Sequence, residues 1–423
     1  MAPAQDTVAN IFVEHRVDAT IISFRRNSDG AVREFRLLPI REKLERLQRK
    51  LPDYLDLFRR KIGPQDTVTL SDAQAGAAME ELETFSGLYF EALLRGSGFQ
   101  VGDFVDEIAR LLTPALQSQL GKGIVPTLVI DELGSAGTLG ATFPVELLPV
   151  AELWESRSSA MNSSTAALGQ HMARFLGLRA ITVRRQRQGP DVFSRDAQQK
   201  TPLDLFAHVG ADYPGIARQI AYFRNNKSDF AITEMPGTAP KFIEHPDRDV
   251  AGMLFAMGTN GVGANQVAHF CCHYVTQDAV GGRGYKRLSR LDFGNNISFS
   301  VGELQGTLVN LADLGRLEHA GRHLVFLNAC TSAALEDEED SLIVCLLRRG
   351  FDHIVGSEAE LPDRVAGEFA TRLYRALLRG MTLGAAVLQA RKELIEVHRN
   401  PAGLLYTLFG NPGLRLRPEA ATA

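Results

Sequence analysis

Short runs of mostly apolar residues recur along this chain and alternate with segments of helical periodicity. Four such runs are VPTLVIDEL (125–133), QVAHFCC (266–272), HLVFLNA (323–329) and HIVGS (353–357). A brief run without polar alternation is typical of a strand that is covered on both faces of a sheet. The alternation therefore predicts an α/β fold with a mostly parallel sheet flanked by helices.

The pattern also predicts how the 423 residues are divided. Residues 1–186 contain a β-hairpin at 19–39, helical stretches over about 73–95 and 102–121, and one buried strand. Residues 187–250 are rich in Pro, Asp and Gln, which indicates a loop-rich connection around one helix at about 212–225. Residues 251–423 resume the alternation of strands and helices. The length allows one large core or two ordinary ones, since domains usually have about 100–200 residues.

Charge and composition exclude several classes of partner. The chain has 46 Lys and Arg against 50 Asp and Glu, and no long basic run, which argues against nucleic-acid binding. No segment approaches the roughly 18 apolar residues of a membrane span, and no signal peptide is recognisable at the N-terminus. We therefore expect a soluble, cytoplasmic protein. Its four cysteines lack CxxC spacing and are predicted to be reduced thiols.

Two residues that can act together chemically follow predicted strands. Cys330 comes directly after HLVFLNA, and His273 comes directly after QVAHFCC, 57 residues earlier. In an open parallel sheet, the functional crevice lies beyond the carboxyl ends of the strands. If these two strands are neighbours, the thiol and the imidazole enter one cleft. A thiol with a pKa of about 8.5 is mostly protonated at neutral pH, and a nearby imidazole can accept its proton.

Each of these residues also has a purely structural interpretation. A free cysteine packs like a small hydrophobic residue, and a single histidine is more often structural than catalytic. His269 lies inside its predicted strand and is interpreted as structural. Cys271 and Cys272 adjoin His273, but consecutive strand residues point to opposite faces, and no second Cys/His pair has ligand spacing. We expect neither a metal nor another cofactor.

Two segments resemble a known family. HFCCHYV (269–275) is similar to the histidine block, and LVFLNACTSA (324–333) to the cysteine block, of CHAT-domain peptidases, the caspase-like group related to separases. The resemblance continues through 346–391 and 400–416 and, more weakly, 126–150. It implies a cysteine endopeptidase with an N-terminal inactive caspase-like half (1–186) and a C-terminal catalytic half (251–423).

The resemblance also implies roles for individual residues. His273 is the general base, Cys330 is the nucleophile, and the backbone N–H groups of Cys330 and Tyr274 form the oxyanion hole. Tyr274 stands where the family usually has glycine. A side chain there restricts the backbone, which leaves the direction of that N–H group open.

The loop GSEAELPD (356–363) is a second departure from the family pattern, which frequently has a tryptophan here. In separase-like relatives, an acidic residue of this stretch lines the pocket for a basic P1 side chain. Glu360 and Asp363 are the matching substrate-binding residues. Asp363 has a plainer alternative, because it stands at the start of the helical segment RVAGEF, where aspartate commonly caps the helix.

Two classes of function remain. The first is an active endopeptidase that cleaves one specific protein. Some relatives act in bacterial antiviral defence by cutting a gasdermin-like pore former, and many are controlled by attached repeat domains. No repeat of 20–50 residues is recognisable here, so we expect a separate activator. The alternative is a catalytically silent caspase-like interaction or scaffold module, which Tyr274 keeps open.

Overall fold

The computed structural model describes 7–38, 67–123, 125–133, 145–148, 175–184, 200–208, 213–235, 246–259, 267–281, 284–314, 323–329, 341–348, 351 and 353–416. The chain divides into two compact units. The first comprises residues 1–186 and 384–404, and the second comprises residues 187–383 and 405–423. None of the helices in the described ranges is long and apolar enough to cross a membrane.

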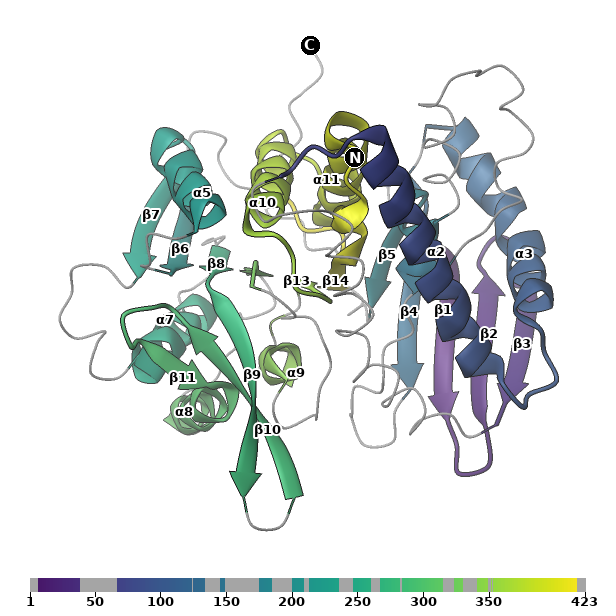
Figure 1. The fold of residues 1–423 in the computed structure, drawn as a ribbon, viewed down its shortest axis with the longest axis horizontal. Coiled ribbons are helices and arrows are strands. Elements are labelled where there is room, and N and C mark those ends of the chain that lie inside the picture. The colour runs from purple at the N-terminus through teal and green to yellow at the C-terminus, as the bar shows by residue number, and fades with distance from the viewer. Residues whose placement is uncertain are drawn as a thin grey trace. The chain divides into compact units, whose positions relative to one another are not determined.

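The first unit is built on five strands in the order β3-β2-β1-β4-β5 (Figure 1). β1, β4 and β5 run parallel, while β2 and β3 form the predicted antiparallel hairpin beside β1. The strands are β1 (Thr7–His15), β2 (Thr20–Arg26), β3 (Val32–Leu37), β4 (Thr127–Leu133) and β5 (Ile181–Arg184).

Two helices of the first unit lie close to where the sequence predicts them. α2 (Asp72–Leu94) begins with a reciprocal capping box between Ser71 and Gln74, which satisfies backbone N–H groups at its start. α3 (Val101–Gly121) contacts β1, β2 and β3. Two short 3-10 helices, η2 (Val145–Leu147) and η4 (Leu176–Leu178), pack against each other.

A third helix of the first unit comes from the C-terminal part of the chain. α11 (Leu383–His398) and η6 (Pro401–Leu405) follow the second unit in sequence, yet residues 384–404 cluster with the first. The fully buried Arg391 of α11 donates from Nη1 to the Gly177 carbonyl at 3.0 Å and to Thr182 Oγ1 at 3.2 Å. The chain therefore crosses between the units more than once.

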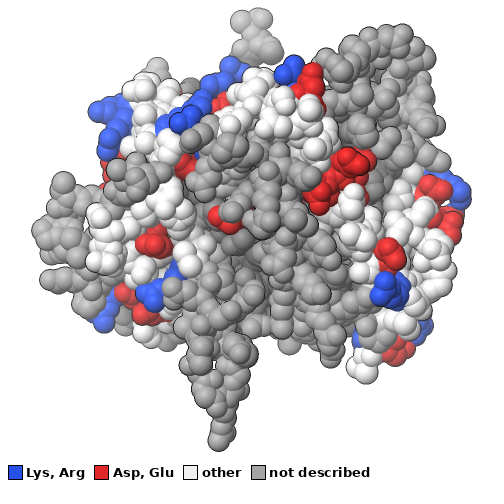
Figure 2. Space-filling model, in the orientation of Figure 1, with Lys and Arg blue, Asp and Glu red and all other residues white. Residues whose placement is uncertain are grey.

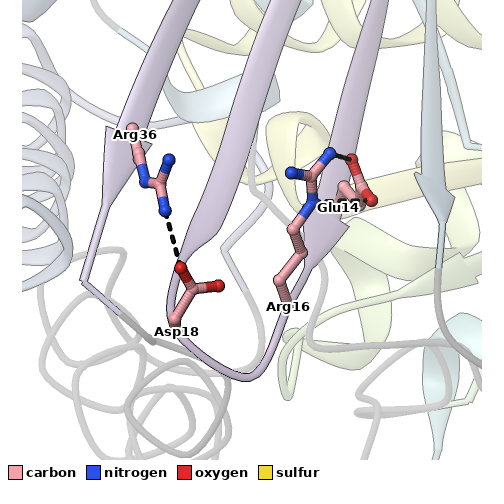
Figure 3. Close-up of polar contacts among 4 residues, drawn as sticks. All are labelled: Glu14, Arg16, Asp18 and Arg36. Carbon is pink, nitrogen blue, oxygen red and sulfur yellow. Dashed lines mark hydrogen bonds and ion pairs between the residues drawn. The ribbon is translucent and has the colours of Figure 1, made fainter.

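Exposed ion pairs lie at the surface of the β1–β2–β3 region. Arg16 Nε lies 2.9 Å from Glu14 Oε1, and Arg36 Nη2 lies 2.6 Å from Asp18 Oδ2 (Figure 3). Figure 2 shows described basic and acidic side chains interspersed across the visible face of the molecule. Exposed pairs are screened by solvent and contribute little to stability, and these mark no site.

The second unit is built on six strands in the order β14-β13-β12-β8-β6-β7, and all are parallel to their neighbours except β14. Helices therefore flank a mostly parallel sheet, as predicted. The strands are β6 (Thr201–Ala207), β7 (Phe230–Met235), β8 (Val267–Cys271), β12 (Leu324–Leu327), β13 (His353–Ser357) and β14 (Tyr406–Gly410).

The segment predicted as a loop-rich connection contributes directly to this sheet. Its described part contains β6, α5 (Pro214–Asn225) and β7, and β6 pairs with β7 on one side and β8 on the other. The helix was predicted but the strands were not. Pro202 and Asp204 have low strand propensity, which is why the sequence did not indicate β6. Burial of Leu203 and Leu205 stabilises this segment as a strand.

The two faces of the second sheet pack against different helices (Figure 1). On one face, Phe270 and Leu327 belong to a core that includes residues of α7 (Pro246–Thr259), α8 (Val301–Leu314) and α9 (Leu342–Arg348). On the other, His269 and Phe326 contact Tyr374 of α10 (Asp363–Leu378). This alternation follows from the two-residue period of a strand.

A small antiparallel sheet leaves the large one immediately after β8. The chain bends at Cys272, and β9 (His273–Gly281) then pairs with β10 (Gly284–Asp292), which pairs with β11 (Ser298–Ser300). His273 is therefore the first residue of β9 and stands at the junction of the two sheets.

Candidate functional site

The strands that precede His273 and Cys330 are neighbours, which meets the condition that the sequence left open. β8 and β12 run parallel, from the pair Val267 and Leu324 to the pair Phe270 and Leu327. One more backbone bond, from Asn328 N–H to the Phe270 carbonyl at 2.8 Å, extends this ladder. Every pair is separated by 57 positions in the chain. Cys330 itself lies outside the described residues.

Two aromatic rings hold the imidazole of His273. The Tyr213 ring lies 4.2 Å from it and the His208 ring 5.1 Å from it, centroid to centroid, both edge-on. His273 is half-buried, and its Nε2 atom is buried without a hydrogen-bond partner among the described residues. Among the described residues, these two ring contacts orient the imidazole.

His208 is a second histidine at the same edge of the sheet, and sequence analysis missed it. It directly follows β6, and its N–H donates to the Cys271 carbonyl at 2.9 Å. Burial, followed by the charge of His273, lowers the pKa of His208, while Asp292 acts in the opposite direction. A Cβ on Gly294, whose φ is +76°, would lie 2.7 Å from the His208 ring, so only glycine fits there.

Asp363 caps a helix, but not the one that the sequence suggests. It is the first residue of α10, whose N-cap is Pro362, without a side-chain bond. Its carboxylate instead accepts the N–H groups of Gly215 and Ile216 at the N-terminus of α5, the latter at 3.1 Å. Burial raises the pKa of Asp363, and these two bonds and the charge of His273 partly offset that rise. The carboxylate therefore ties α5 to α10.

The other acidic residues of the 356–363 loop differ in exposure. Glu358 is buried, its Oε1 accepts from Thr407 Oγ1 at 2.9 Å, and its N–H donates to the Leu405 carbonyl. Glu360 is exposed. Of these two, only Glu360 presents a solvent-accessible carboxylate.

Tyr274 occupies an ordinary extended conformation. It is the second residue of β9, pairs with Leu291 of β10, and buries its side chain in the core that contains Phe293. Extended backbone is open to every residue type. The expected restriction by this side chain therefore produces no strained backbone, and the role of its N–H in an oxyanion hole stays a prediction.

A buried polar network lies beneath the carboxyl edge. His269 is fully buried, and burial lowers its pKa to about 3, in agreement with a structural role. Its Nε2 lies 2.7 Å from Gln219 Oε1 and its Nδ1 lies 3.0 Å from the Tyr374 hydroxyl. Asn328 Nδ2 donates to the same Gln219 oxygen at 2.8 Å.

Asn328 has two further partners. Its Nδ2 also donates to the Ala366 carbonyl at 3.0 Å, and the Tyr406 hydroxyl donates to its Oδ1 at 2.5 Å. Sequence analysis did not single out Asn328 or Gln219. A polar residue at the end of an apolar strand was the available signal for Asn328, whereas nothing in the sequence linked it to Gln219.

The described cysteines are unsuited to nucleophilic chemistry. Cys271, Cys272 and Cys345 are all buried, and burial raises the pKa of Cys271 far above its usual value. A buried, protonated thiol is inert. Within the described ranges, no cluster of three or more His, Cys, Asp or Glu residues could hold a metal ion.

Comparisons with known proteins give three findings. The family model described as CHAT domain matches residues 108–406. A probable protease of Vitiosangium sp. (strain GDMCC 1.1324) is 34% identical over 112 residues, which are 26% of this chain and 15% of that protein. Two crystal structures of the Saccharomyces cerevisiae separase–securin complex cover 96% of this chain and 30% of their own, at 10% and 11% identity and a TM-score of 0.44. The chain thus spans a minor part of the length of these relatives.

Proposed function

We propose that this chain, which belongs to the CHAT-domain family, is a cysteine endopeptidase that cleaves a specific protein with a dyad of Cys330 and His273. The observation that carries the proposal is the register of β8 and β12. Their paired residues are 57 positions apart, and so are His273 and Cys330. Because β8 and β12 run parallel and His273 and Cys330 keep the separation of the paired residues just beyond their carboxyl ends, a shared cleft for the two side chains is favoured.

The proposed reaction is acyl transfer to a thiolate. His273 Nε2 takes the proton of the Cys330 thiol, and the sulfur attacks the carbonyl carbon of the scissile bond. The N–H groups of Cys330 and Tyr274 stabilise the resulting oxyanion. Imidazolium then gives its proton to the leaving amine, and water, deprotonated by the same imidazole, hydrolyses the thioester. Nε2 of His273 is buried and has no hydrogen-bond partner among the described residues, which supports its role as the proton acceptor.

Substrate selection is proposed to involve the acidic loop. Glu360 is exposed and can face a basic P1 side chain, whereas Asp363 is engaged by the N-terminus of α5. A carboxylate facing arginine makes a strong, oriented pair. In the wider biological role that we propose, a separate activator switches on the cytoplasmic enzyme, which cleaves a gasdermin-like pore former in antiviral defence.

The test compares wild-type protein with Cys330→Ala and His273→Ala on a peptide library varied at P1 and on candidate protein substrates, with cleavage read by mass spectrometry. Each substitution is expected to lower kcat/KM at least about a thousandfold, since dyad members act as a unit. Cys345→Ala, which alters a buried thiol in α9, serves as the matched control and keeps activity.

Cleavage that survives in Cys330→Ala would contradict the proposal. Wild-type protein that stays silent with every candidate activator, and whose Cys330 resists alkylation at neutral pH, would instead support the interaction or scaffold module.

A further inference from the structure

Helix α5 contacts the neighbourhood of both proposed catalytic residues. Tyr213, its N-cap residue, packs on His273, and Gln219, in its second turn, bonds Asn328, two residues before Cys330. We propose that α5 is a brace that aligns the dyad, with Tyr213 and Gln219 as positioning residues. This inference rests on the proposed peptidase function and adds to it the residues that set its geometry.

On the histidine side, the brace acts through ring packing. Tyr213 and His208 lie 4.8 Å apart, centroid to centroid, and both rings lie edge-on to His273. Together they limit rotation of the imidazole, a task that a hydrogen-bonded carboxylate or carbonyl performs in many catalytic dyads. The ring of Tyr213 makes this contact.

On the cysteine side, the brace acts through hydrogen bonds whose directions can be assigned. The Ala366 carbonyl can only accept, so the Asn328 atom beside it is the donor Nδ2. The same Nδ2 donates to Gln219 Oε1. This leaves Asn328 Oδ1 to accept from the Tyr406 hydroxyl. Asn328 is thereby fixed from three elements, α5, α10 and β14.

The same assignment determines the tautomer of His269. Because Gln219 Oε1 can only accept, His269 Nε2 is protonated and donates its N–H to that oxygen. His269 Nδ1 is then unprotonated and accepts from the Tyr374 hydroxyl. Removing the Gln219 oxygen would leave a buried N–H on His269 unpaired and would remove one partner of Asn328, so Gln219 is the central member of the network.

Close helix packing holds the brace in place. A Cβ on Gly215 would overlap the Asp363 backbone, and a Cβ on Gly367 would lie 2.8 Å from the Gly215 carbonyl oxygen. The two glycines therefore allow α5 and α10 to touch. The Asp363 carboxylate then bonds the N–H groups of Gly215 and Ile216, directly after Tyr213 and Pro214. The position of Tyr213 is thus set by α10.

The first experiment compares Gln219→Met with Arg224→Gln. Arg224 lies on the same helix but pairs with Glu234 at the surface, which makes its variant a matched control. We expect Gln219→Met to lower kcat and the rate of Cys330 alkylation by iodoacetamide about tenfold or more, because a small misplacement of reacting groups is sufficient for such a loss. KM should change less than about twofold, since no substrate contact is removed. Arg224→Gln should match wild type.

A second pair of variants tests the histidine side without disturbing the buried network. Tyr213→Phe keeps the ring and should retain kcat and the rate of Cys330 alkylation. Tyr213→Ala removes the ring and should lower kcat and the alkylation rate. It should also broaden or shift the pH profile of alkylation. Equal rates for all four variants would overturn the brace, provided that the wild type cleaves in a Cys330-dependent manner. Absence of such cleavage and of selective Cys330 alkylation in the wild type would instead count against the peptidase.

An NMR measurement tests the network independently of activity. In wild-type protein with ¹⁵N-labelled histidine, His269 should carry its proton on Nε2 and remain neutral at pH 5. A proton on Nδ1 with none on Nε2 would show that Gln219 does not accept from His269 and would overturn the cysteine side of the brace.

Discussion

At the scale of single residues, burial is the main cause of the shifted pKa of Asp204, His269 and Cys271. Asp204 of β6 is the clearest case outside the site. Burial raises the pKa of its carboxyl to about 6, and no charged group among the described residues contributes to this shift. Because an aspartate is unusual in a central strand, the sequence indicated a loop where β6 lies. Packing of Leu203 and Leu205 outweighs the unfavourable carboxylate.

Asp204→Asn is therefore expected to stabilise the protein at pH 7. The folded state holds the Asp204 proton more tightly than the unfolded chain does, so the wild-type residue is tolerated below about pH 4 and becomes destabilising as the pH rises through about 6. The variant should gain about 2 kcal/mol at pH 7, after allowance for partial exposure, and little at pH 3.5. Urea unfolding at both pH values measures this, and an equal gain at both would contradict the assignment to titration.

At the scale of elements, the sequence predicted what local pattern determines and missed what tertiary contacts determine. The apolar runs at β8, β12 and β13 predicted their burial, whereas the sequence left open whether the strands before His273 and Cys330 are neighbours. The contact of α5 with α10 was not predictable. Its tie to α10 depends on Asp363, 148 residues beyond Gly215, and on two glycines that carry no periodic signal.

The contact between α5 and α10 gives a prediction for glycine substitution. Gly215→Ala should destabilise the protein by about 2 kcal/mol, because the added Cβ would overlap the Asp363 backbone and overpacking outweighs the gain in helix propensity. Gly306→Ala in α8 is the matched control, since a Cβ there meets nothing within 4 Å and should stabilise by about 0.5–1 kcal/mol. Thermal unfolding of both variants gives the comparison, and a stabilised Gly215→Ala would show that the helices do not approach so closely.

At the scale of the whole molecule, the division of the chain differs from a simple succession of halves. The family resemblance implied an N-terminal half and a catalytic half beginning at residue 251. In the compact units, residues 384–404 cluster with residues 1–186, although they lie between two segments of the second unit in sequence. A periodic apolar helix such as α11 shows in sequence that it is buried, but not against which core. The polar anchor of Arg391 on Gly177 and Thr182 decides this.

Arg391→Ala should therefore weaken the first unit, although the residue lies late in the chain. The fully buried guanidinium donates to Gly177 and Thr182, and it offsets the charge of Glu146, which also pairs with Arg184. Its loss leaves the buried Glu146 with less compensation and opens a cavity, for an expected destabilisation of about 3 kcal/mol. Hydrogen exchange should consequently accelerate in β4 and β5 more than in β8 and β12. The matched control is Glu396→Ala, an exposed position on the same helix, which should leave exchange unchanged. Faster exchange confined to the second unit would mean that α11 packs in the core of that unit, whose segments flank it in sequence.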